Sequence, residues 1–209
     1  TINGVPLNDS ESQGVFWVDL PDFGSSVSNN QIQRGVGTST NGTGAFGATV
    51  NLNTQSTDPE PNAQVSLGLG SFNSQKYNVL LSTGLLKNKF SLEGRLSRIT
   101  SDGYIDRASA ELNSYYLSGT YLGKNSSLRL NIFSGHEVTY QAWIGVPAQF
   151  VDDRELRTIN TAGAERSGSP HPNEVDDYTQ THYQLIYNLN TSNRSNLQAT
   201  LHYTKGEGF

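Results

Sequence analysis

The sequence predicts an all-β fold in which a glycine-rich N-terminal region precedes about seven antiparallel strands of a transmembrane β-barrel. Three observations lead to this prediction. Polar and apolar residues alternate over most of the chain beyond residue 62, the connections sort into short and long ones, and no helical period follows the glycine-rich region. No apolar run approaches the roughly 20 residues that a membrane-spanning helix needs.

The N-terminal region, residues 1–58, contains many turn signals, and short strands are predicted near 31–34 and 48–53. The loop between them is rich in glycine, which tolerates positive φ angles and close backbone approach. Its glycines are Gly35, Gly37, Gly42, Gly44 and Gly47. Residues 42–47 also fit the G-x-G-x-x-G pattern of dinucleotide sites, but such a site requires a helix after the loop. A strand is predicted there, so a tight glycine turn is favoured.

A linker is predicted at 57–62, because Pro59 and Pro61 cannot continue a central strand. Residues 59–209 form the second region. Their alternation predicts seven strands of about ten residues, the length at which a tilted strand crosses a bilayer. The rows that define these strands lie at 65–69, 77–85, 90–97, 115–121, 128–132, 183–189 and 197–203, with Leu80 as an exception to the alternation.

The connections between the predicted strands carry independent information. Short turns at 87–89, 123–127 and 191–194 would lie at one rim of the sheet. Longer loops near 101–110 and 137–176, with a short join at 71–75, would lie at the other rim. Outer-membrane barrels sort their connections in this way, with the long loops outside the cell. A bacterial single-chain barrel has an even number of strands, so seven strands predict a fragment of a larger barrel.

A secreted or surface β-sandwich that binds a ligand remains an alternative, because alternation also fits an antiparallel sheet with one face in a core. The net charge of −5 disfavours a nucleic-acid partner, whose phosphates need a basic surface. The absence of cysteine excludes disulfide scaffolds and Cys-type zinc sites. The first residues lack the features of a signal peptide, so the chain is expected to begin inside a larger protein or after a removed signal.

No enzyme is predicted, because the sequence contains no nucleophile elbow, Ser/His/Asp constellation or convincing carboxylate pair. Nor is a metal site predicted: no spacing makes the acidic and histidine side chains in or beside the longest loop converge, and a solvated acidic loop is favoured. These side chains are His136, Glu137, His171, Glu174, Asp176 and Asp177. Tyr140 and Trp143, in the same loop, are candidate ligand contacts, although aromatic residues there would equally fix the loop to its neighbours.

Several segments resemble TonB-dependent outer-membrane receptors. The C-terminal half of their plug domain is matched by residues 31–53 of this chain. This stretch contains QIQRG at 31–35, the glycine loop, and GATVNLN at 47–53. Further matches are FW at 16–17, SDGYIDR at 101–107, TYQAW at 139–143 and HYQL at 182–185. The variant of the glycine loop is similar to receptors of the Bacteroidetes group and differs from the SusC-type glycan importers.

This resemblance implies residues 1–58 of a plug and the first strands of a 22-stranded barrel in the outer membrane of a Gram-negative bacterium. The implied function is active import of a siderophore, haem, cobalamin, similar metal complex or peptide, without a resident cofactor. The implied partners are that ligand, outer-membrane lipid, the TonB–ExbB–ExbD complex and, in some receptors, a surface lipoprotein. A passive channel is the alternative.

The resemblance also implies site residues. Arg34, with Gly35, would anchor the plug to glutamates of the barrel wall, and Gly37, Gly42, Gly44 and Gly47 would form the plug loop. The polar composition of the plug predicts a hydrated contact with the wall that can shift at modest free-energy cost.

Overall fold

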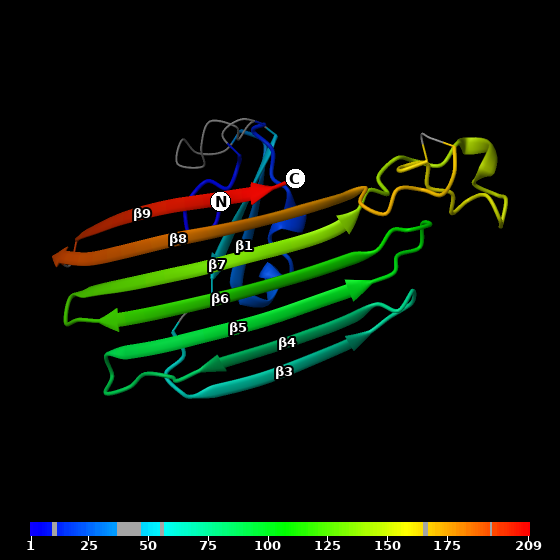
Figure 1. The fold of residues 1–209 in the computed structure, drawn as a ribbon. Coiled ribbons are helices and arrows are strands. Elements are labelled where there is room, and N and C mark those ends of the chain that lie inside the picture. The colour runs from blue at the N-terminus through cyan, green and yellow to red at the C-terminus, as the bar shows by residue number, and fades with distance from the viewer. Residues whose placement is uncertain (10–11, 37–46, 55–56, 165–166, 193) are drawn as a thin grey trace.

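A computed structural model gives the structure of the protein and describes residues 1–9, 12–36, 47–54, 57–164, 167–192 and 194–209. These residues form one two-stranded and one seven-stranded antiparallel sheet. Figure 1 shows the smaller sheet lying across one face of the larger one. We call residues 1–54 the N-terminal segment and the seven-stranded sheet the wall. No helix in the described part of the chain is long and apolar enough to cross a membrane.

The N-terminal segment contains two short 3-10 helices, η1 (Trp17–Asp19) and η2 (Phe23–Ser26), and then the hairpin of β1 (Val27–Arg34) and β2 (Ala48–Thr54). Its first residues join this hairpin, because Ile2 forms a parallel bridge to Leu52. The strand that follows Gly47 confirms that no helix continues from the glycine loop, as a dinucleotide site would require.

The wall contains seven strands in chain order, each paired antiparallel with the next. They are β3 (Asn62–Leu69), β4 (Gln75–Ser82), β5 (Phe90–Ser101), β6 (Ala110–Leu122), β7 (Ser126–Tyr140), β8 (Val175–Ser192) and β9 (Ser195–Gly208). All seven predicted strands are thus confirmed. The long loop is shorter than predicted, because β7 continues to Tyr140 and β8 begins at Val175. The apolar rows end before these strands do, so the alternation of polarity gave no sign of the additional backbone pairing.

The two faces of the wall have inverted polarity for a sheet in water. Leu67, Leu96 and Leu201 on one face are 70%, 64% and 71% exposed. The opposite face, which the N-terminal segment covers, buries polar side chains: Arg95 and Asn131 are 1% and 0% exposed. In a soluble sandwich the apolar face would be the buried one. An apolar outer face with a polar inner face is the pattern of a membrane barrel, in which lipid covers the apolar residues.

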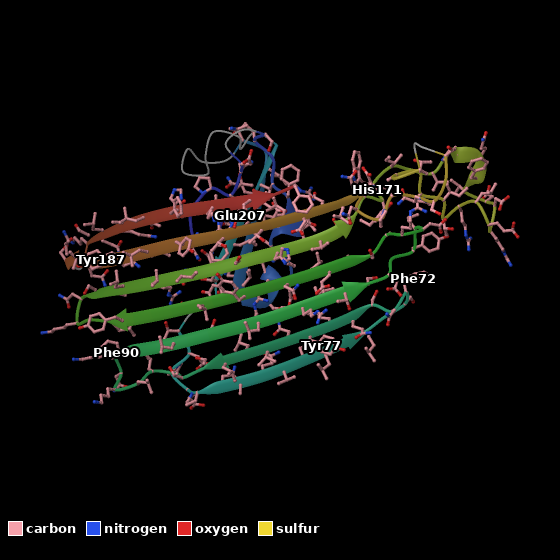
Figure 2. The ribbon with its side chains drawn as sticks, in the orientation of Figure 1. Phe72, Tyr77, Phe90, His171, Tyr187 and Glu207 are labelled. Carbon is pink, nitrogen blue, oxygen red and sulfur yellow. The ribbon has the colours of Figure 1, made fainter. Side chains whose placement is uncertain are left out.

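The connections sort as the sequence predicts. Short turns follow β6 and β8 at one end of the wall, and the 141–174 loop follows β7 at the other (Figure 1). We call these the short-turn end and the long-loop end. Aromatic side chains lie near both: Figure 2 shows Phe90 and Tyr187 toward the short-turn end, and Phe72 at the long-loop end. The ring of Phe90 lies 5.0 Å from that of Tyr121. Aromatic girdles at both interfaces are typical of outer-membrane barrels.

Ion pairs lie on the outer face beyond the apolar rows, toward the long-loop end. They are Arg98–Glu111 and Lys205–Glu207, each at 2.9 Å, and in the same region the ring of His136 is hydrogen-bonded to Asp177 at 3.0 Å. Arg98 and Lys205, for example, follow the last outward apolar residues of their strands, Leu96 on β5 and Tyr203 on β9. Charged side chains are costly in a bilayer core and ordinary in water. The strands therefore extend past the apolar band at this end.

The connection from the N-terminal segment to the wall packs against the turn between β4 and β5. Gly84, at φ +64°, lies so close to it that a Cβ there would be 2.6 Å from the nitrogen of Pro61. The amide of Leu85 donates to the carbonyl of Pro59 at 3.0 Å. Arg129 of β7 donates to the hydroxyl of Thr57 at 3.0 Å. The proline-containing linker is therefore held at the short-turn side of the sheet.

Candidate functional site: the contact between the N-terminal segment and the wall

An apolar cluster lies at the centre of the contact. Ile2, Leu20 and Phe23 of the N-terminal segment pack against Tyr116 and Phe133 of the wall. The rings of Phe23 and Phe133 have centroids 5.0 Å apart. Truncating such a buried aromatic residue to alanine typically costs about 3–5 kcal/mol. Because these apolar side chains are buried against one another, the contact is less hydrated than the polar composition of this segment predicts.

Gly135 of β7 allows the backbone of the N-terminal segment to approach the wall. A Cβ at this position would overlap the carbonyl oxygen of Asp19 and lie 2.5 Å from Cδ of Pro21. Neither group is a flexible side-chain end that could move aside. Glycine is therefore required here by close packing.

Asp22 is the main polar contact between the two parts. It has a left-handed backbone conformation, φ 54° and ψ 21°, directly before η2. Its carboxylate accepts hydrogen bonds from the wall: 2.5 Å from Nζ of Lys76, 2.6 Å from Nδ2 of Asn78 and 2.7 Å from Oγ of Ser97. Ser25, in η2, donates at 2.6 Å. One carboxylate thus joins η2 to two strands.

Arg95 completes this polar contact from β5. Its Nη1 lies 3.5 Å from the Asp22 carboxylate, and its side chain is 1% exposed. Its Nε donates to Oγ of Ser26 at 2.6 Å, and its Nη1 donates to Oγ of Ser114 at 3.3 Å. The two charges share a setting where water is largely excluded, so Arg95 needs Asp22 as its counter-ion, and Lys76 is a second cationic partner of Asp22.

The electrostatics favour an ionised Asp22. Burial alone would raise its pKa, but the hydrogen bonds from Lys76, Ser25, Ser97 and Asn78 outweigh it and lower the pKa to about 2. Opposite behaviour is seen at Asp19, where burial and the charge of Asp176 raise the pKa against a hydrogen bond with Glu137.

Glu137 corrects the prediction of a solvated acidic loop. It lies on β7, is 1% exposed, and accepts a hydrogen bond from Thr139 at 3.2 Å. Its inward position on a strand, beneath the N-terminal segment, explains its burial. His136 also lies on β7, but its ring faces outward toward Asp177. Within the described ranges no group of three or more such side chains could hold a metal ion.

A second set of hydrogen bonds joins the start of the chain to β8. Nδ2 of Asn3 donates to Oε1 of Gln184 at 2.9 Å, and Nε2 of Gln184 donates to the carbonyl of Ile2 at 3.2 Å. His182, one residue pair along the same inner face, stacks on Phe133 at 4.7 Å. It therefore lies on the inner face of the wall.

Arg34 and Gly35 lie at the end of β1, and both are exposed. Gly35 has φ +80°, and its amide donates to the carbonyl of Gly47 at 2.8 Å, which closes the base of the glycine loop. Gly37, Gly42 and Gly44 lie outside the described residues. The role of Arg34 as an anchor stays a prediction, and Asp22 and Arg95 are the contact that the sequence reasoning did not identify.

Tyr140 and Trp143 have different surroundings. Tyr140 is 8% exposed, its hydroxyl donates to the carbonyl of His171 at 2.7 Å, and Arg107 lies over its ring at 5.6 Å. Arg107 also donates to the carbonyls of Asn160 and Ala162. Tyr140 therefore holds the 141–174 loop, while Trp143 is 79% exposed and available for contact. Figure 2 shows His171 in this loop, at the long-loop end.

Comparison with solved structures identifies the fold. The ferripyoverdine receptor of the outer membrane of Pseudomonas aeruginosa has a TM-score of 0.73 and 16% identity over 98% of this chain and 27% of that chain. The ferric-catecholate import receptor of E. coli K12 has a TM-score of 0.73 and 13% identity over 98% and 31%. The siderophore receptor of Acinetobacter baumannii has a TM-score of 0.72 and 12% identity over 99% and 28%. No family model and no curated protein matches the chain.

These neighbours are transport receptors rather than enzymes. The chain has the fold of a TonB-dependent outer-membrane receptor, over part of the plug and seven barrel strands. It spans about a quarter to a third of the length of the solved receptors. From here on we call the N-terminal segment the plug.

Proposed function

We propose that this chain is the plug-to-barrel portion of a receptor that imports a scarce ligand, such as a siderophore or another metal complex, across the outer membrane with energy from TonB. The observation that carries the proposal is the polar inner face of the wall, which is covered by a separate segment of the same chain. The similar receptors bind ferripyoverdine or import ferric catecholate, by their descriptions, and this favours an iron complex as ligand.

The plug–wall contact supports an actively gated receptor over a passive channel. Asp22 and Arg95 form an ion pair across this contact, and the apolar cluster also joins the two parts. These contacts would close the barrel at rest and must be broken for transport, which requires energy. A passive channel has no need of such a covering segment. The apolar outer face disfavours a soluble β-sandwich.

We further propose that Arg34 and Gly35 anchor the plug to wall strands beyond this sequence, that Trp143 contacts the ligand, and that the plug–barrel boundary lies near residue 58. The exposure of Arg34 and Trp143 is compatible with such partners.

The test is uptake by cells that carry the whole receptor. The ligand is first identified by mass spectrometry of the receptor purified under iron limitation. Uptake of that ligand should then depend on the receptor gene, on TonB and on the proton gradient. Equal uptake after the gradient is collapsed would instead favour the passive channel.

A further inference from the structure

Four cationic or polar side chains of the wall converge on one carboxylate. Lys76 and Asn78 are successive inward residues of β4, and Arg95 and Ser97 are successive inward residues of β5. Asn78 pairs directly with Ser97 in the register. The four side chains therefore project from adjacent positions on two paired strands, and the pairing of these strands sets their backbone positions.

The plug supplies the anion that these donors bind. Both oxygens of Asp22 accept hydrogen bonds from the wall. Oδ1 accepts one from Lys76, and Oδ2 accepts one from Asn78 and one from Ser97. Nη1 of Arg95 lies 3.5 Å from Oδ2. Convergent charged and amide donors of this kind are the usual way in which proteins bind carboxylates and small oxyanions. Asp22 fills that site as a tethered ligand would.

We propose that Lys76, Asn78, Arg95 and Ser97 form a lumenal binding site for a carboxylate or similar oxyanion of the imported ligand, and that Asp22 occupies this site in the resting plug. The inference rests on the proposed import function in one respect: that function supplies the imported ligand as the molecule that carries the anion. The site itself is defined by the contacts described above.

The charge balance explains how such a site would act. When the plug moves, Arg95 and Lys76 lose the carboxylate that pairs with both of them, and two neighbouring cations are left without a counter-ion. An anionic group on the ligand restores neutrality. The ligand therefore competes with Asp22, which both favours the displaced plug and provides a step along the inner wall.

Chemical rescue with formate tests the proposal without knowledge of the ligand. The whole receptor is placed in liposomes, and leakage of a small trapped dye is measured. Asp22→Gly suits the left-handed backbone at this position and leaves a carboxylate-sized space. We expect roughly tenfold or greater leakage from the loss of the buried pair, and a saturable return toward the wild-type rate with added sodium formate.

Three controls make the result specific. Asp22→Asn fills the space with an amide, so its leakage should rise without rescue by formate. The double variant Asp22→Gly/Arg95→Gln should also lose the rescue. Asp58→Ala, in the exposed linker, should leak like the wild type in either salt, and sodium chloride at equal ionic strength should not replace formate.

The proposal is overturned if formate and chloride act equally on Asp22→Gly, or if the double variant is rescued as well. Barrel folding is monitored in every variant by electrophoretic mobility before and after heating. Because leakage needs neither TonB nor the natural ligand, failure of this test leaves the uptake test of the import function unaffected.

Discussion

At the scale of single residues, Asp22 and Arg95 link parts of the chain that lie 73 residues apart in the sequence. Arg95 is inward-facing by simple alternation, and a buried cation on a barrel strand requires a counter-ion. Local sequence does not say which carboxylate provides it. The sequence therefore predicts the direction of Arg95 but not its partner, and Asp22, in a short turn without periodicity, carries no signal of its own.

The low pKa of Asp22 predicts an acid-sensitive plug. Because the folded pKa of about 2 lies below the ordinary value of 3.8, the ionised carboxylate stabilises the closed state. This contribution is present above pH 3.8 and is lost as the pH falls to about 2. Dye leakage from liposomes should rise over this interval in the wild type. Asp22→Asn should leak more at neutral pH and show a smaller rise, and parallel profiles would contradict the assignment.

Gly135→Ala should weaken the plug–wall contact. The added methyl group would overlap the backbone of Asp19, and overpacking of this kind typically costs about 1–3 kcal/mol. The urea concentration at which leakage begins should fall. Gly119→Ala is the matched control, because its Cβ would be 3.5 Å from Cδ2 of Leu92, an ordinary contact on the outer face. Equal shifts for the two variants would refute the close-packing argument.

At the scale of elements, the number and positions of the seven strands were predictable from the sequence, and the lengths of the strands were not. Alternation identifies a strand only while one face is apolar and the other polar. On β7 beyond Ile132, both faces carry polar residues such as Ser134 and Glu137, yet the ladder continues to Tyr140. Glu137 was assigned to a solvated loop for this reason. The conformation of the 141–174 loop, fixed by Arg107 and Tyr140, depends on contacts between separate loops and has no periodic signature.

Tyr140→Phe should loosen the 141–174 loop without affecting the barrel. The variant loses the hydrogen bond to His171, a contribution of about 1 kcal/mol. Limited proteolysis of the receptor in liposomes should cut this loop faster. Tyr121→Phe, on the outer face near the short turns, should leave the cleavage rate unchanged. An unchanged cleavage rate for Tyr140→Phe would show that the other contacts hold the loop without this hydrogen bond.

At the scale of the whole molecule, the inverted polarity of the wall determines where the protein can exist. Its outer leucines need lipid, and its inner polar groups need the plug or water. The outer edges, β3 and β9, each have one neighbour among the described strands, so further strands are needed to close a barrel. The class of fold follows from this pattern, and the pattern was readable because it repeats over seven strands.

Leu130→Arg should impair insertion into bilayers, whereas His136→Arg should not. Leu130 faces outward within the apolar row of β7, and arginine at the bilayer midplane costs about 2–4 kcal/mol. His136 lies beyond that row, beside Asp177. Urea titrations of refolding into lipid vesicles would measure both changes. Similar losses for the two variants would show that the apolar band extends further than we infer.

Because β7 and β8 continue past the apolar band, their ends at the long-loop end project beyond the bilayer. The 18 residues of β8 correspond to about 60 Å of strand, and even at a tilt of about 45° this exceeds the roughly 25 Å of an apolar barrel band. The excess is paired strand that lies in water. If the protein imports a ligand as we propose, these strands would let it meet that ligand above the lipid headgroups, before the ligand reaches the level of the bilayer.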